Sequence, residues 1–330
     1  MTLSVIASLG AGRMGRGIAH AFAYGGHDVL LVDLKERAPE AARKLAEEAR
    51  AEVDASLAML ASLGAFDDAV RPGVLARIRC VARADAPAAL ARADVVFEGV
   101  PEVLDAKRAA FEWACAHLRA DAIVASTTST MLSTQLAGFV THPERFLNAH
   151  WLNPAYLVPL VELSPHPGTA PAIVARMKAL LEAIGKVPVL CAVAPGFIAP
   201  RMQALMMNEA ARMIEQGVAS AEDIDRAVRY GLGFRYANMG VVEFIDVGGL
   251  DILYYASRYL AESTGDARYA SPEIVNRYMR EGHDGLRAGR GFYDWKAIDV
   301  PAYRRDALGR QLALLKQLGM LKPPGAAQRD

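Results

Sequence analysis

Cysteine is scarce in this chain and follows no pattern. The three cysteines, Cys80, Cys115 and Cys191, lie far apart, and none belongs to a CxxC pair. An odd number of scattered cysteines makes neither a disulfide framework nor a metal-ligand cluster. We therefore expect reduced thiols in a cytoplasmic protein, and we predict no metal site.

Excess charge and long apolar runs are also missing. The 37 basic and 37 acidic residues cancel, so the charge balance gives no reason to expect nucleic acid or an anionic membrane as a partner. No apolar run approaches the about 20 residues of a membrane-spanning helix. Because a predicted strand already begins at Leu3, we expect no signal peptide. We therefore expect no nucleic acid and no membrane as a partner; a small-molecule partner is predicted from the motifs instead.

A glycine-rich turn joins the first two predicted strands. The first strand runs from Leu3 to Leu9, the turn reads G-A-G-R-M-G over residues 10–15, and the second strand, D-V-L-L-V-D, ends at Asp33. In a dinucleotide-binding βαβ unit the first glycine permits the tight turn and the second lets the backbone approach a pyrophosphate. The third lets the helix pack closely, with its N-terminus toward the phosphates. The alternative is a tight turn that binds nothing.

The acid that ends the second strand bears on which dinucleotide binds. A carboxylate there accepts hydrogen bonds from a ribose hydroxyl and repels a 2′-phosphate. Lys35 and Arg37 follow closely and soften that preference. We predict that NAD, rather than NADP, is bound by Gly10, Gly12, Arg13, Met14, Gly15 and Asp33.

The order of predicted elements indicates an α/β protein. A helical stretch to Leu63 and a short helix from Asp67 to Ala76 form an inserted hairpin. Further strands are predicted at Ile78–Val81, Val95–Glu98, Ile123–Ser126, Phe146–His150, Leu160–Leu163 and Val187–Leu190. This alternation is typical of a Rossmann-type doubly wound sheet, here with the last strands partly antiparallel.

The pattern changes at Ala194-Pro195-Gly196, and the segment that follows is helical in period. Ser220, followed by Glu222 and Asp223, indicates a capped helix start. We therefore predict an NAD-binding Rossmann domain with a helical hairpin insert over residues 1–193. An all-α C-terminal domain for substrate binding and dimerisation is predicted over residues 194–330.

One histidine lies where a base is needed for alcohol oxidation. Removing a hydride from a carbinol to NAD requires a base for the hydroxyl proton, and histidine suits that task near neutral pH. His150 ends a predicted strand, at the edge where open α/β sheets bind ligands. The next strand carries Glu162, which can orient the imidazole if the two strands face each other. A structural histidine with an unrelated downstream acid is the alternative.

Two further segments lie at the same predicted edge. The run A-S-T-T-S-T from Ala125 to Thr130 offers hydroxyls that either bind a substrate oxygen or cap the next helix. Glu102 and Lys107 follow the strand that ends at Glu98, where the nicotinamide ribose is expected. The alternative for this pair is a solvated helix start.

These motifs together resemble the L-3-hydroxyacyl-CoA dehydrogenase family over nearly the whole chain. The resemblance rests on G-A-G-R-M-G-R-G-I-A, P-E-V-L-D-A-K, S-T-T-S-T, P-E-R-F-L-N-A-H-W-L-N-P, V-P-L-V-E-L, P-G-F-I, E-D-I-D-R-A-V-R-Y-G-L-G and R-A-G-R-G-F-Y-D-W. It implies a homodimer in which His150 is the catalytic base, Glu162 orients it and Ser129 binds the substrate oxygen. It also implies cofactor contacts for Glu102, Lys107 and Arg287. At the position of Arg287 the family usually has lysine. Substrate contacts are implied for Ser56 and Asn153.

Three departures from the family pattern concern the substrate. Pro200 stands where the family usually has an asparagine that polarises the substrate oxygen. The hairpin has no lysine between Lys44 and Lys107 to meet coenzyme A. The segment R-Y-A-N-M-G-V-V-E from Arg235 to Glu243 is longer than usual and is similar to the gulonate dehydrogenase (lambda-crystallin) branch, whose substrates are free 3-hydroxy acids.

Four interpretations follow from the sequence. The first is an NAD-dependent oxidation of an L-3-hydroxyacyl-CoA, and the second is a dehydrogenase of a free 3-hydroxy acid. A lysine-dependent 3-hydroxy-acid dehydrogenase is disfavoured because no lysine lies between Lys186 and Lys296. A non-enzymatic, crystallin-like binding protein is disfavoured by the retained Ser129, His150 and Glu162.

Overall fold

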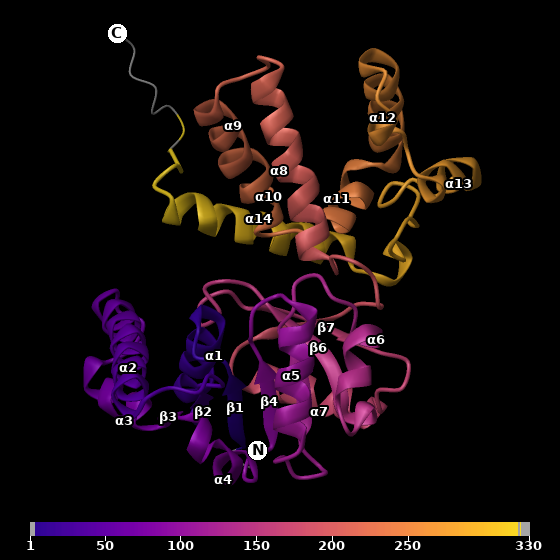
Figure 1. The fold of residues 1–330 in the computed structure, drawn as a ribbon. Helices are drawn as coiled ribbons and strands as arrows, with labels where there is room; N and C mark the ends of the chain where they lie inside the picture. Colours follow the sequence, from indigo (N-terminus) through magenta and orange to yellow (C-terminus); the bar gives the residue numbers. More distant parts are fainter. Residues whose placement is uncertain (1–3, 323, 325–330) are drawn as a thin grey trace. The chain divides into compact units, whose positions relative to one another are not determined.

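The chain forms two compact units. The structure, a computed structural model, describes residues 4–322 and 324. The units comprise Met1–Met207 and Asn208–Asp330 (Figure 1). The division falls within helix α8 (Ala199–Glu215), whereas the boundary predicted from composition lies before this helix.

An eight-stranded sheet organises the first unit. Its spatial order is β3-β2-β1-β4-β5-β6-β7-β8, and every neighbouring pair is parallel except β6 with β7. The strands are β1 (Val5–Leu9), β2 (Asp28–Val32), β3 (Ile78–Val81), β4 (Val95–Glu98), β5 (Ile123–Ser126), β6 (Phe146–Trp151), β7 (Leu160–Pro165) and β8 (Val187–Leu190). The doubly wound sheet with an antiparallel step near its end is confirmed. Leu3, which the sequence places in the first strand, lies outside the described residues.

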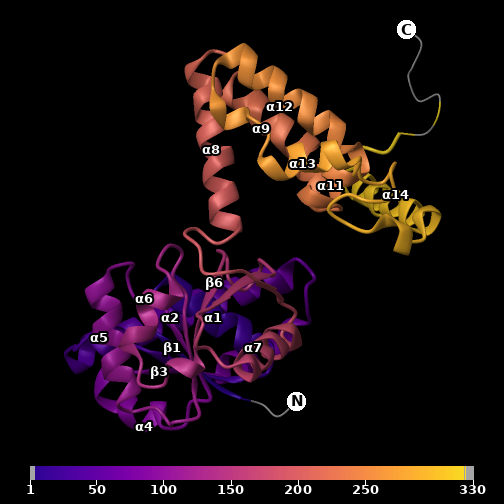
Figure 2. The ribbon, with the colours of Figure 1, turned by 90° about the vertical axis from the view of Figure 1, so that its right-hand side faces the viewer.

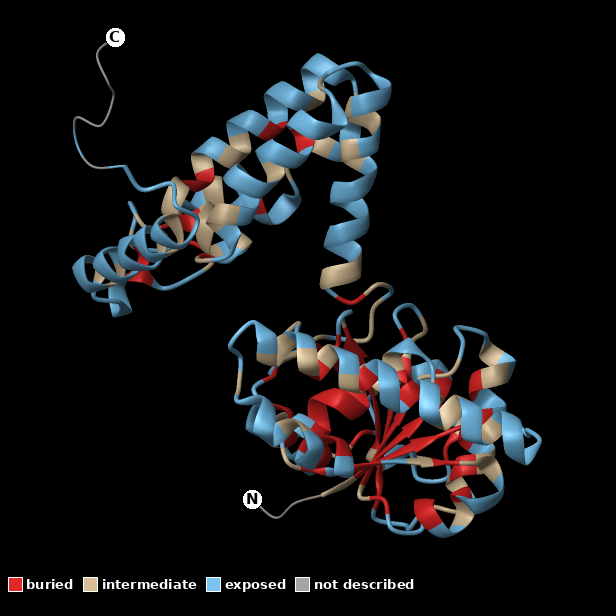
Figure 3. Ribbon diagram, turned by 90° about the vertical axis from the view of Figure 1, so that its left-hand side faces the viewer, coloured by how far each residue is buried: buried red, intermediate tan, exposed pale blue. Residues whose placement is uncertain are grey.

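Helices cover both faces of this sheet and bury its central strands, whereas the edge strand β8 is partly exposed (Figure 3). On one face lie α1 (Arg13–Tyr24), α2 (Pro39–Ser62), α3 (Arg71–Ala76) and α7 (Pro171–Ala183), which share one apolar core. On the other lie α4 (Ala86–Leu90), α5 (Leu104–Cys115) and α6 (Ser133–Leu136). Burial of both faces explains why the strands read as continuous apolar runs rather than alternating ones.

The helical hairpin is present, but its second part is not one helix. A 3₁₀ turn over Asp68–Val70 precedes α3. Pro72 lies in the first turn of α3 and has no N–H with which to continue a helix from the preceding residues. The predicted helix from Asp67 to Ala76 is therefore divided at this proline.

In its described residues, the second unit is built from helices, with two isolated β-bridges (Figure 2). Besides the C-terminal part of α8 and two 3₁₀ turns (Ala267–Tyr269 and Trp295–Ala297), it contains α9 (Ala221–Ala227), a π-helical turn (Val228–Gly233), α10 (Phe234–Tyr236), α11 (Val241–Gly248), α12 (Leu250–Thr264), α13 (Glu273–Glu281) and α14 (Val300–Gln317). Ser220 caps α9 as predicted, accepting from the Asp223 amide.

A buried aspartate organises the loop that carries the R-A-G-R-G-F-Y-D-W motif. Asp246 of α11 is fully buried and accepts hydrogen bonds from the Phe292 and Tyr293 amides and from the Trp295 indole. Three donors satisfy the carboxylate away from water, so this part of the motif has a structural role. Across the described residues, no helix has the length and apolar character needed to span a membrane.

Candidate active site

The glycine-rich turn forms an open cradle after β1. Gly10 has φ +102°, a backbone conformation that favours glycine, and a Cβ at Gly15 would come within 1.9 Å of the Gly10 carbonyl oxygen. A Cβ at Gly12, by contrast, would meet nothing within 4 Å. The turn borders a cavity of about 690 Å³ that Asp33 and Gly99 also line. Two glycines are thus required by backbone contacts, and the third faces open space that fits a dinucleotide phosphate.

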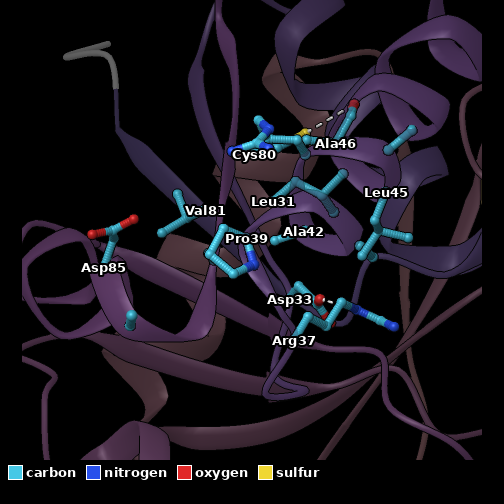
Figure 4. A pocket seen from close by; sticks show the side chains of 15 residues that line it. Leu31, Asp33, Arg37, Pro39, Ala42, Leu45, Ala46, Cys80, Val81 and Asp85 are labelled. Carbon is cyan, nitrogen blue, oxygen red and sulfur yellow. Dashed lines mark hydrogen bonds and ion pairs between the residues drawn. The ribbon is translucent and has the colours of Figure 1, made fainter.

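Asp33 lies at the carboxyl end of β2 and forms an ion pair. Its Oδ2 is 2.5 Å from Arg37 Nε, and its Oδ1 accepts from the Lys35 amide at 3.2 Å. Both residues line a second cavity, of about 390 Å³, together with mainly apolar residues of β2, α2 and β3. Figure 4 shows the pair among the other lining side chains. Arg37 therefore orients the carboxylate and leaves its own charge close to the expected ribose position.

We expect activity with NAD to exceed that with NADP by at least about 10-fold, because Asp33 repels a 2′-phosphate. Asp33→Ala should narrow the gap, chiefly by weakening NAD, and it also frees Arg37 from its ion pair. The measurement is kcat/KM for both cofactors. Asp28→Ala, at the exposed opposite end of β2, is the matched control. Equal efficiency of the wild type with both cofactors would contradict the prediction.

The sheet register brings His150 and Glu162 into direct contact. The two residues are cross-strand partners in the antiparallel pair β6 and β7. His150 Nδ1 lies 2.8 Å from Glu162 Oε2, and both side chains are buried. Because a carboxylate only accepts, this contact assigns the proton to Nδ1. Nε2 is then the ring nitrogen able to accept a proton.

The other carboxylate oxygen of Glu162 is also bound. Its Oε1 accepts from the backbone amides of Ile198 at 2.9 Å and Ala199 at 2.7 Å, where α8 begins. The positive end of a helix favours a carboxylate at this position. Pro200, which follows these donors, has no N–H to add and is tolerated in a first helical turn.

A buried ion-pair network supports the loop of Ser129. Lys107 Nζ lies 2.9 Å from Glu98 Oε1 and 3.1 Å from Glu102 Oε2, and its side chain is 1% exposed. Glu102 Oε1 accepts from the Ser129 and Thr130 amides and from the Thr128 hydroxyl. That Glu102 and Lys107 contact the cofactor stays a prediction. Within the protein, Lys107 pairs with Glu102, and Glu102 binds the loop that carries Ser129.

Glu102 is kept ionised in this network. Burial by itself raises the pKa of its carboxyl group, but the Thr128 hydrogen bond and the Lys107 charge outweigh burial, so the pKa is lowered. An ionised carboxylate accepts all of the loop's donors at once. The exposed Ser129 side chain is thereby presented from a fixed backbone.

A third cavity brings the two predicted substrate residues together. Ser56 of α2 and Asn153, which follows β6, both line a space of about 350 Å³ with Arg13, Arg16 and His20. The Ser56 hydroxyl is 2.8 Å from His20 Nδ1. Burial, with the Lys186 charge, lowers the pKa of His20 to about 4, so the imidazole is neutral near pH 7.

The charges of this cavity are unequally neutralised. Arg16 pairs with Glu52, whereas Arg13 makes no ion pair with any residue in the described part of the chain. Arg13, predicted as a cofactor residue, thus lines the cavity of Ser56 and Asn153. Met14, its neighbour in the motif, packs against the apolar core.

Arg287 lies in the second unit and is engaged within it. Its guanidinium pairs with Asp251 and, at 3.0 Å, with Asp284. The predicted cofactor contact of Arg287 stays a prediction.

Sequence reasoning missed several residues at this edge. The buried acid Glu98 and the amide donors of Ile198 and Ala199 had no predicted role. An acid that ends an apolar strand and the P-G-F-I motif were the available signals. Neither identifies a hydrogen-bond partner: Lys107 lies 9 residues from Glu98 in the chain, and Ile198 and Ala199 lie 36 and 37 residues from Glu162.

Both units match a described protein family. Residues 5–194 match "3-hydroxyacyl-CoA dehydrogenase, NAD binding domain", and residues 196–295 match "3-hydroxyacyl-CoA dehydrogenase, C-terminal domain". Together the two matches span most of the chain, and the first supports NAD as the cofactor.

Individual relatives differ in their substrates. The 5-formyl-3-hydroxy-2-methylpyridine 4-carboxylate 5-dehydrogenase of Mesorhizobium japonicum is 30% identical, covering 95% of this chain and 97% of that protein. The 3-hydroxybutyryl-CoA dehydrogenase of Bradyrhizobium diazoefficiens is 34% identical, covering 89% and 96%. The crystal structure of a 3-hydroxyacyl-CoA dehydrogenase from Archaeoglobus fulgidus has a TM-score of 0.75 and 30% identity, covering 96% of this chain and 100% of that one.

Proposed function

This chain belongs to the 3-hydroxyacyl-CoA dehydrogenase family, and we propose that it oxidises the 3-hydroxyl group of an L-3-hydroxyacyl-CoA with NAD. The observation that carries the proposal is the 2.8 Å contact between His150 Nδ1 and Glu162 Oε2. It lies at the same sheet edge as the glycine cradle, because β1 and β6 both end there.

The side chains at this edge have separate tasks. When bound, NAD supplies the hydride acceptor. His150 Nε2 accepts the hydroxyl proton, and the Glu162 carboxylate stabilises the imidazolium that results. The Ser129 hydroxyl donates to the substrate oxygen, while Ser56 and Asn153 contact the substrate beyond the reacting carbon.

A free L-3-hydroxy acid is the second candidate substrate, and the surroundings of two arginines favour it. Arg71 of α3 is engaged by Asp54 at 2.5 Å and by Asp68 at 2.7 Å, so its charge is not available for a coenzyme A phosphate. Arg13, in the cavity of Ser56 and Asn153, is instead available to meet a carboxylate. The relative from Mesorhizobium japonicum is likewise named for a free carboxylate and not for a CoA thioester.

A substrate panel tests the proposal. Each charge-assisted phosphate contact contributes about 1.5–3 kcal/mol, so losing one should raise KM for a CoA thioester by roughly 10- to 100-fold. We expect measurable but weak NADH oxidation with acetoacetyl-CoA. A micromolar KM would contradict the free-acid candidate, whereas turnover on free acids alone would contradict the CoA proposal. No turnover on any CoA thioester or free acid of the panel would support the crystallin-like alternative.

We also propose that the second unit mediates a homodimer. Helices α11 to α14 bury only a few residues: Asp246, Leu250, Ser257, Val275 and Ala307. On α12, by contrast, Ile252, Tyr255 and Tyr259 are between 62% and 70% exposed, at a spacing that places them along one side of the helix. An exposed apolar side of a helix is typical of a protein–protein interface.

We expect a two-fold dimer with an interface well above about 1,000 Å². Light scattering at micromolar concentration should therefore give twice the 35.5 kDa chain mass. Tyr259→Glu should shift the protein toward monomer by placing a charge on the apolar side of α12. Val187→Glu, on an exposed position of the first unit, is the control. A monomeric wild type would count against this assignment.

A further inference from the structure

A strained turn lies next to the His150–Glu162 pair. Gly196 has φ +76° and Phe197 has φ +46°, so two successive residues adopt the left-handed backbone region. Phe197 is the sole non-glycine residue with positive φ in the described ranges, 4–322 and 324. An aromatic residue is disfavoured there, and such strain persists mainly where surrounding contacts enforce it, often at functional sites.

The ring of Phe197 lies against the catalytic histidine. The two ring centroids are 5.4 Å apart with an interplanar angle of 16°, which is a stacked arrangement. Phe197 is 6% exposed, so its ring also keeps water from that face of the imidazole. Stacking restricts rotation of the His150 ring and adds to the orientation that the hydrogen bond to Glu162 provides.

The backbone that follows the same turn binds Glu162. Directly after Phe197, the Ile198 and Ala199 amides donate to Glu162 Oε1. Left-handed conformations at Gly196 and Phe197 turn the chain so that both amides point to one oxygen. One residue therefore contacts His150 through its side chain and aims two donors at Glu162 through its backbone.

We propose that Phe197 is a positioning residue for the His150–Glu162 pair. Its ring fixes the imidazole plane, and its left-handed backbone sets the two amides that hold the Glu162 carboxylate. The catalytic consequence rests on the proposed function, but the positioning itself concerns the free protein. A core phenylalanine without this role would gain nothing from a strained backbone.

The first test needs no substrate. A proton shared between imidazole and a buried carboxylate gives a low-field signal in proton NMR of ¹⁵N-histidine-labelled protein, and the His150→Gln variant identifies it by its loss. We expect this signal in the wild type and in Phe197→Tyr, which keeps the ring. In Phe197→Leu, which keeps an apolar side chain of similar size, the signal should broaden beyond detection.

The second test measures turnover of acetoacetyl-CoA with NADH. A misplacement of about 1 Å can cost 10²-fold in rate, so Phe197→Leu should lower kcat by roughly 10- to 100-fold, with KM for NADH unchanged. Phe197→Tyr should restore most of it. Phe111→Leu, at a fully buried phenylalanine of α5, is the matched control for lost core packing and should preserve both the signal and kcat.

The outcomes separate this inference from the proposed function. An unchanged signal and kcat in Phe197→Leu would overturn the inference, as would equal losses in Phe111→Leu. Without wild-type turnover on any substrate, the proposed function fails. Loss of the signal in Phe197→Leu alone would still support positioning. Phe197→Gly, which accepts positive φ but has no ring, should lose the signal and remain folded by circular dichroism, and retention would overturn the role of the ring.

Discussion

His150→Gln should lower kcat by about 10²–10⁴-fold, which is the usual contribution of a positioned general base and corresponds to roughly 2.7–5.5 kcal/mol. Glutamine keeps a polar group of similar reach but cannot accept the hydroxyl proton. The nucleotide cradle lies on other strands, so NADH binding should be retained. The measurements are steady-state kcat and fluorescence titration with NADH.

His142→Gln provides the control for this substitution. His142 is an exposed histidine of the same unit, outside the site, and its replacement should leave kcat unchanged. Near-wild-type turnover of His150→Gln would end the proposed mechanism. A loss of NADH binding that parallels the loss of kcat would instead indicate a structural role for His150.

Glu162→Gln should be of similar severity, because a carboxamide cannot satisfy all partners of Glu162. One carboxylate oxygen faces His150 Nδ1, and the other accepts from the Ile198 and Ala199 amides. With the amide oxygen toward the backbone donors, the NH₂ group faces Nδ1 and forces it to accept. The proton then moves to Nε2, the wrong tautomer for a base, a change that costs about 10⁴-fold in the serine protease triad.

We expect kcat of Glu162→Gln to fall by about 10²–10⁴-fold with KM for NADH little changed. Glu182→Gln, an exposed position of α7, controls for the loss of one negative charge. Full activity of Glu162→Gln would show that orientation by the carboxylate is not needed. Thermal unfolding of both variants distinguishes lost orientation from lost folding.

Local sequence patterns were sufficient to locate the strands of the first unit. The apolar run Ile78–Val81 has the same bounds as β3, and Val95–Glu98 has the same bounds as β4. Strand formation depends on short stretches of β-branched and apolar residues, and the central strands of this sheet are buried on both faces. The glycine spacing likewise predicted the turn, since glycine has no Cβ and readily adopts the positive φ found at Gly10.

The interruption of the hairpin near Pro72 could have been predicted from the sequence but was not. A proline in a helical pattern removes one N–H donor, and the structure divides the predicted helix there. Bounds of helices are the least certain feature of such patterns because several residues at each end satisfy similar propensities.

What the sequence by itself determined was the strands of the sheet, the dinucleotide turn and the identity of the histidine and the acid at the sheet edge. Only the tertiary structure decided their contacts. Antiparallel pairing of β6 with β7 sets His150 opposite Glu162, and a shift of one residue would turn each side chain to the other face. The strained turn at Phe197 is 47 residues beyond His150 in the chain, and the buried Lys107 is paired with two acids. Such contacts depend on the closure of long loops and on packing between distant segments, and no local pattern encodes either.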